Sequence, residues 1–280
     1  MRVMQVPVLA PSGFYNMAYA EWGDPASDRV LVCVHGLTRN RRDFDFLAQA
    51  LSDRWRVICP DIPGRGDSDY LDNKADYAIP NYIAICAALI ARLGVAEVAW
   101  LGTSMGGIIG MGLASRPNTP IKRLVVNDIG PFVPGAALKR IGGYVGADVR
   151  FADRDHAEAA LRASMVSFGI KRDDHWRYVT EISTQPDGEG RLRLRYDPGV
   201  AQIFTANMED IAFWPLWDAI TCPVMIVHGV NSDILTAETA AEMTTRGPKA
   251  RRLEIRDCGH APMLWEGAEI AAVRAFLEAG

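Results

Sequence analysis

Residues 102–106 read Gly-Thr-Ser-Met-Gly and carry the clearest chemical signal in the chain. The apolar run 98–101 precedes them and a run of small residues follows, which predicts a strand, a tight turn and a helix. A serine at such a turn exposes its hydroxyl at the carboxyl end of the strand. Glycines on both sides let the strand and the helix pass close together. Ser104 is therefore the predicted nucleophile.

A serine hydroxyl is a poor nucleophile near neutral pH and needs a base within hydrogen-bond reach. His260 is the best placed of the five histidines, because its loop joins a predicted strand, 250–255, to a predicted helix, 262–279. In a parallel sheet, loops that follow strands open at the same edge, so this loop should lie near Ser104. His260 is therefore the predicted general base.

The base needs an acid that orients it, and two aspartates follow predicted strands. Asp233 lies in the loop after the strand 223–228, and Asp128 follows the strand 122–127. We favour Asp233, because the interval from it to His260 has room for one helix and one strand. Asp128 remains the alternative. The resulting order along the chain is Ser…Asp…His.

A tetrahedral intermediate needs hydrogen-bond donors for its oxyanion. One donor is expected from the backbone N–H of Met105, directly after the nucleophile. A second is expected from Leu37, which follows the apolar strand 30–34 in a His-Gly-Leu loop where Gly36 allows close approach. His35 is predicted to play a structural part in this loop.

Strands and helices alternate along much of the chain, which predicts a mostly parallel sheet with helices on both faces. This alternation of strands and helices is interrupted between residues 130 and 214, where amphipathic stretches replace buried strands. More than eighty residues are too many for a loop. We therefore predict a core of residues 1–130 and 215–280 and an inserted helical cap of residues 131–214.

Charge and composition argue against several classes of binding partner. The net charge of −4 gives no reason to expect binding to nucleic acid or an anionic membrane, and no apolar run approaches the roughly 18 residues of a membrane span. The first residues lack a signal-peptide pattern and the five cysteines lack CxxC spacing, so a cytoplasmic protein with reduced thiols is expected.

The chain resembles the α/β-hydrolases over nearly its whole length. The motifs that carry the resemblance are His35-Gly36, the loop 61–68 (Asp-Ile-Pro-Gly-Arg-Gly-Asp-Ser), the elbow 102–107, Asp233 and Gly259-His260. The resemblance implies an eight-stranded sheet and acyl transfer through Ser104, with no metal or cofactor. A serine nucleophile argues against haloalkane dehalogenases and epoxide hydrolases, which carry aspartate at that position.

Within this family the sequence favours a carboxylesterase acting on small or medium acyl substrates, as a monomer or homodimer. Lactonase, amidase, carbon–carbon bond hydrolase and perhydrolase are alternatives, although Thr103 stands where carbon–carbon hydrolases usually carry asparagine. A small-molecule receptor that keeps the triad is a remoter alternative. Candidate substrate contacts are Trp214 and Met263, together with Arg39, Arg41 or Arg42 for an acidic substrate.

Overall fold

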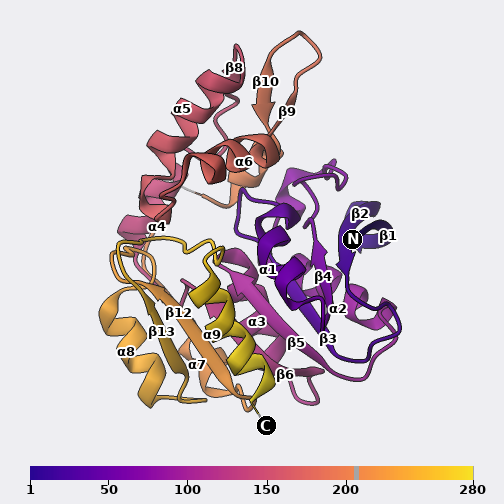
Figure 1. Ribbon diagram of the computed structural model, residues 1–280, viewed down its shortest axis with the longest axis vertical. Coiled ribbons are helices and arrows are strands. Elements are labelled where there is room, and N and C mark those ends of the chain that lie inside the picture. The colour runs from indigo at the N-terminus through magenta and orange to yellow at the C-terminus, as the bar shows by residue number, and fades with distance from the viewer. Residues whose placement is uncertain (205–207, 280) are drawn as a thin grey trace.

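The computed structural model describes residues 1–204 and 208–279, and its central feature is an eight-stranded sheet (Figure 1). In spatial order its strands are β1 (Arg2–Ala10), β2 (Gly13–Trp22), β4 (Arg56–Pro60), β3 (Val30–Val34), β5 (Val98–Thr103), β6 (Ile121–Asn127), β12 (Val224–Gly229) and β13 (Arg251–Ile255). β1 and β2 run antiparallel to their neighbours, whereas β4 through β13 pair in parallel. The predicted fold class, a mostly parallel eight-stranded α/β sheet, is confirmed.

Helices cover both faces of this sheet because its central strands are apolar on both sides. In β3, residues 30, 32 and 34 belong to one hydrophobic cluster and residues 31 and 33 to the other, as the two-residue period of a strand requires. The first face is covered by α2 (Ile79–Arg92), α3 (Met105–Ala114), α7 (Trp214–Asp218) and α8 (Ala237–Thr245). The second face is covered by α1 (Asp45–Leu51) and α9 (Gly267–Glu278).

The segment between β6 and β12 adds no strand to the main sheet within its described residues. Its longer helices are α4 (Gly135–Gly142), α5 (Arg154–Ser164) and α6 (Asp173–Ser183). It also has short strands that form two small sheets: β8 (Arg150–Phe151), β10 (Leu192–Leu194) and β9 (Thr184–Pro186) in one, and β7 (Phe132–Val133) with β11 (Ile211–Ala212) in the other. Two short 3-10 helices also lie in this segment, η3 (Val166–Phe168) and η4 (Pro198–Ile203). Two others lie in the core, η1 (Arg41–Phe44) and η2 (Lys74–Asp76).

Most of the inserted segment lies beyond the ends of the strands of the main sheet, at the top of Figure 1. It packs on the core through a small apolar cluster in which Trp176 and Val179 of α6 meet Trp265. The buried side chain of Asn40 also donates to the carbonyl of Ile182 at 2.7 Å. Within 1–204 and 208–279, no helix combines the length and the apolar character that a membrane crossing requires.

Candidate active site

Ser104 lies on a sharp turn between β5 and α3. Its backbone has φ 51° and ψ −112°, a conformation that side-chain-bearing residues rarely adopt. A methyl group on Gly102 would overlap the carbonyl of Gly106, and one on Gly106 would overlap the carbonyl of Val34. Glycines at these two positions therefore permit the close strand–helix approach that holds Ser104 in this strained turn.

The serine hydroxyl, the imidazole and a carboxylate form one hydrogen-bonded chain. The Oγ of Ser104 lies 2.9 Å from Nε2 of His260, and Nδ1 of His260 lies 2.9 Å from Oδ2 of Asp128. Asp128 is fully buried and also accepts hydrogen bonds from the backbone N–H of Gly229 at 2.8 Å and from Oγ of Ser232 at 2.5 Å. These donors hold the carboxylate in one orientation towards the imidazole.

The structure corrects the predicted place of Asp233. Its half-exposed carboxylate forms a two-pronged ion pair with Arg140 of α4, at 2.7 and 2.8 Å, and makes no hydrogen bond to His260. The turn after β12 presents Ser232, not Asp233, to the buried Asp128. β6, which ends just before Asp128, is the direct neighbour of β5, whereas β12 lies one strand further away. Strand order in space is not readable from the sequence, although the position of Asp128 directly after an apolar run was a usable signal.

The two amides predicted as oxyanion donors lie beside Ser104. Met105 follows the serine directly, and a methyl group on Gly36 would come within 3.7 Å of the serine Cβ, which places the Gly36–Leu37 loop against it. Leu37 and Met105 both line the same cavity as Ser104. Within the described part of the chain, neither backbone N–H donates a hydrogen bond. Both are thus available to a ligand.

His35 is a buried structural residue of this loop. Its Nδ1 donates to the carbonyl of Gly36 at 2.7 Å, and its Nε2 accepts the N–H of Ile62 at 2.9 Å. This arrangement requires the neutral imidazole, since protonated Nε2 could not accept. Burial, aided by the nearby arginines, lowers the pKa of His35 to about 3.

Because the pKa of His35 is lower in the folded state, its contribution to stability is complete above its unfolded value near 6.5 and is lost as pH falls from there towards 3. The unfolding free energy should fall by up to about 1.4 kcal/mol per pH unit in this window. The measurement is urea unfolding of the wild type and of His35→Gln between pH 7.5 and 4.5. We expect the variant to be less stable at pH 7.5 and the gap to narrow on acidification. A gap that is independent of pH would contradict this assignment.

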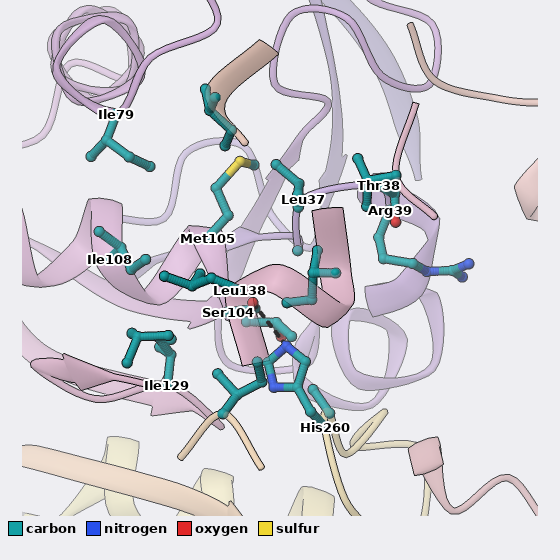
Figure 2. Close-up of a pocket in the computed structure, with 18 of the residues that line it drawn as sticks. Leu37, Thr38, Arg39, Ile79, Ser104, Met105, Ile108, Ile129, Leu138 and His260 are labelled. Atoms are coloured by element: carbon teal, nitrogen blue, oxygen red, sulfur yellow. Dashed lines mark hydrogen bonds between the residues drawn. The ribbon is translucent and has the colours of Figure 1, made fainter. Parts of the chain in front are cut away.

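A cavity of about 720 Å³ adjoins Ser104 and His260 (Figure 2). The core contributes apolar walls from α2 and α3, such as Ile79 and Ile108, and the inserted segment contributes Leu138 and Phe168. The inserted segment therefore covers the strand ends that carry the hydrogen-bonded chain. Such a cavity suits a largely apolar small molecule with a few polar anchors.

Of the five predicted substrate contacts, two line this cavity, Met263 and Arg39, and three do not. Trp214 does not: the guanidinium of Arg246 lies 4.5 Å from its ring, and its neighbours Phe213 and Leu216 face the cavity instead. Adjacent residues of a helix point in different directions, so in α7 the cavity receives Leu216 and not Trp214.

Arg41 and Arg42 are also corrected, because acidic groups of the protein already hold them away from the cavity. Arg41 is buried and forms ion pairs with Asp61 and Asp67. Arg42 pairs with Glu181 at 3.0 Å and with Asp45 at 3.1 Å. These arginines join the core to its own loop and to α6, and neither lines the cavity.

Arg39 does line the cavity, but its guanidinium points away from Ser104 (Figure 2). It binds both carboxylate oxygens of Asp43, at 2.6 and 2.9 Å, and donates to Oγ of Ser183 at 2.6 Å. Arg39, Arg41 and Arg42 are therefore all paired with acidic side chains of the protein, which argues against the prediction that one of them binds an acidic substrate.

Comparison with known proteins gives a consistent result. A family model described as the alpha/beta hydrolase fold matches residues 29–267. The chain is 44% identical to a 3-hydroxybutyrate-oligomer hydrolase from Cupriavidus necator, over 97% of this chain and 96% of that protein. It is 27% identical to a pimeloyl-[acyl-carrier protein] methyl ester esterase from Neisseria meningitidis, over 91% and 95%. Among solved structures, an alpha/beta hydrolase from Novosphingobium aromaticivorans superposes with a TM-score of 0.87 at 35% identity, covering 99% and 98% of the two chains.

Proposed function

This chain belongs to the α/β-hydrolase fold family and is an enzyme with hydrolase activity, and from that premise we propose that it cleaves carboxylic esters through an acyl-enzyme on Ser104. The observation that carries the proposal is the continuous hydrogen-bonded chain from Ser104 through His260 to Asp128 at the wall of an apolar cavity. The relatives named as ester and oligomer hydrolases support the same reaction class.

In the proposed first step, Oγ of Ser104 attacks the ester carbonyl while Nε2 of His260 accepts the hydroxyl proton. Asp128 keeps the proton on Nδ1 of His260, so that Nε2 faces the serine as an acceptor, and stabilises the imidazolium that forms. The free N–H groups of Leu37 and Met105 bind the oxyanion. His260 then protonates the departing alcohol.

In the second step, water replaces the alcohol. His260 accepts a proton from that water, which attacks the acyl-Ser104 carbonyl, and the same two amides bind the second oxyanion. Collapse of this intermediate returns the proton to Ser104 and releases the carboxylic acid. The first proton transfer joins two atoms that lie 2.9 Å apart, Oγ of Ser104 and Nε2 of His260, and the proposed chemistry needs no metal or organic cofactor.

We propose that residues 131–214 act as a cap that selects the substrate, since residues from α4 and η3 form part of the cavity wall. The relative from Cupriavidus necator is named for 3-hydroxybutyrate oligomers. Short oligomers of hydroxyacid esters are therefore the first substrates to test. Their ester carbonyls, separated by short aliphatic units, suit a largely apolar cavity with polar donors beside Ser104.

The proposal is tested with purified protein and a panel of p-nitrophenyl esters of increasing acyl length, 3-hydroxybutyrate dimers and trimers, lactones and an anilide. We expect multiple turnovers with esters and much slower cleavage of the anilide, whose leaving group is poorer. A fluorophosphonate should label Ser104 covalently, because the serine Oγ attacks phosphorus and displaces fluoride. A single hydrolysis per molecule, or equal rates for the wild type and Ser104→Ala, would contradict the proposal and favour a receptor or another catalytic group.

A further inference from the structure

Arg116 differs from the other charged residues of the cavity wall. Among the described residues the charged members of this wall are Arg39, Asp43, Arg116 and Arg140. Arg39 is paired with Asp43, and Arg140 is paired with Asp233. Within the part of the chain that the structure describes, the side chain of Arg116 has no ion pair, hydrogen bond or aromatic partner. Its charge is therefore available to a ligand.

The position of Arg116 follows from the helix that begins at Ser104. Met105, Ile108, Gly112 and Arg116 recur at spacings of three and four residues and all line the cavity, so one face of α3 forms its floor. Arg116 comes just past the end of α3 and is exposed. At 1.5 Å per residue, about 18 Å separates the backbone of Ser104 from that of Arg116.

The space between these two points is apolar. Ile79 and Ile83 of α2 face the cavity opposite α3, and Ile129 and Val133 contribute a further wall. Gly112 and Ile83 both line the cavity at this level and lie close together, since a methyl group on Gly112 would come within 2.5 Å of Cδ1 of Ile83. Figure 2 shows Ile108 and Ile79 on one side of Ser104 and the guanidinium of Arg39 on the other. A substrate whose aliphatic chain extends from Ser104 along α3 would therefore point away from Arg39 and towards Arg116.

We propose that Arg116 binds the terminal carboxylate of a substrate whose aliphatic chain lies along α3. This inference rests on the proposed ester hydrolysis at Ser104 and adds the substrate class: esters that carry a free carboxylate at a fixed distance from the scissile carbonyl. Allowing for the length of the arginine side chain, that distance is roughly ten to fifteen extended chain bonds. The planar guanidinium matches a carboxylate with two parallel hydrogen bonds.

The expected effect is modest because Arg116 is exposed and water competes for it. Exposed ion pairs contribute little and are screened by salt. We expect kcat/KM for a substrate with a free carboxylate to exceed that for its methyl ester by about fivefold, mostly through KM, since the contact is equally present in ground and transition states. The preference should shrink in high salt.

The experiment uses two pairs of substrates, each with the free acid and its methyl ester. One pair is a mono-p-nitrophenyl ester of a diacid of about twelve carbons, which places the carboxylate on the acyl side. The other is 3-hydroxybutyrate tetramer, in which about twelve bonds separate the first ester carbonyl from the terminal carboxylate on the alcohol side. Wild type is compared with Arg116→Gln and Arg116→Lys. Arg42→Gln is the matched control, because Arg42 lies outside the cavity. p-Nitrophenyl acetate reports basal activity.

We expect Arg116→Gln to abolish the preference for the free acid in at least one pair, Arg116→Lys to keep part of it, and Arg42→Gln to keep all of it. Turnover of p-nitrophenyl acetate should be unchanged in all three variants. An unaltered acid-to-methyl-ester ratio in Arg116→Gln, with basal activity intact, would overturn the role of Arg116 alone. Absence of ester turnover in the wild type would instead overturn the proposed function.

Discussion

Replacing Ser104 with alanine is expected to lower ester turnover by at least about a thousandfold. The substitution removes the atom that lies 2.9 Å from Nε2 of His260 and leaves no other nucleophile in its place. The amides of Leu37 and Met105 remain, so a small residual rate above that of water is expected. The measurement is kcat for a p-nitrophenyl ester, with titration of active sites in both proteins.

Ser115 provides the matched control for this prediction. It lies at the opposite end of α3, where its hydroxyl donates to the carbonyl of Gly112 at 3.2 Å. Ser115→Ala should keep nearly all activity, because it makes the same chemical change on the same helix away from the hydrogen-bonded chain. If Ser104→Ala retains most of the wild-type rate, another residue carries the chemistry.

Asp128→Asn is expected to lower turnover by about a thousandfold to ten-thousandfold, whereas Asp233→Asn should change it by no more than a few fold. Asparagine fills the same buried space as Asp128 but presents no negative charge to His260. Its amide can also donate to Nδ1, which would move the ring proton to Nε2 and leave the serine without an acceptor. Asp233→Asn only weakens the half-exposed pair with Arg140.

Comparison of the two variants decides between the two aspartates directly. Their kcat values should be measured on the same ester, and circular dichroism should establish that both proteins are folded. A large loss in Asp233→Asn with near-normal activity in Asp128→Asn would contradict the contact between Asp128 and His260. Equal, large losses would mean that the loop after β12 must be intact to position Ser232 against Asp128.

The local signals in the sequence identified much of the sheet and two residues of the hydrogen-bonded chain. Continuous apolar runs such as 30–34 and 98–101 correspond to β3 and β5, because strands covered on both faces must be apolar throughout. Gly102 and Gly106 indicated a tight turn, because each is required by the close approach of β5 and α3 within a few residues of the serine. His260 was identifiable because it follows the last strand and precedes the last helix of the sheet.

Contacts between distant parts of the chain were much less predictable. The sequence placed Arg41 and Arg42 close to the site, but their acidic partners lie on a separate loop and on α6. Trp214 lies at the start of a short helix whose rotation decides which side chain faces the cavity. Arg116 was missed because only the course of α3 along the cavity wall relates it to Ser104.

By itself the sequence determined the parallel α/β sheet, the strained serine turn and the histidine loop, because backbone geometry and hydrophobic periodicity act over a few residues. Only the tertiary structure decided that Asp128 rather than Asp233 meets His260. It also decided that Arg41 and Arg42 are held by acidic side chains, whereas the side chain of Arg116 has no partner among the described residues. The physical reason is that charged and polar side chains pair with whatever partner packing brings within hydrogen-bond distance. That distance depends on strand order and on the path of the inserted segment, which no short stretch of sequence encodes.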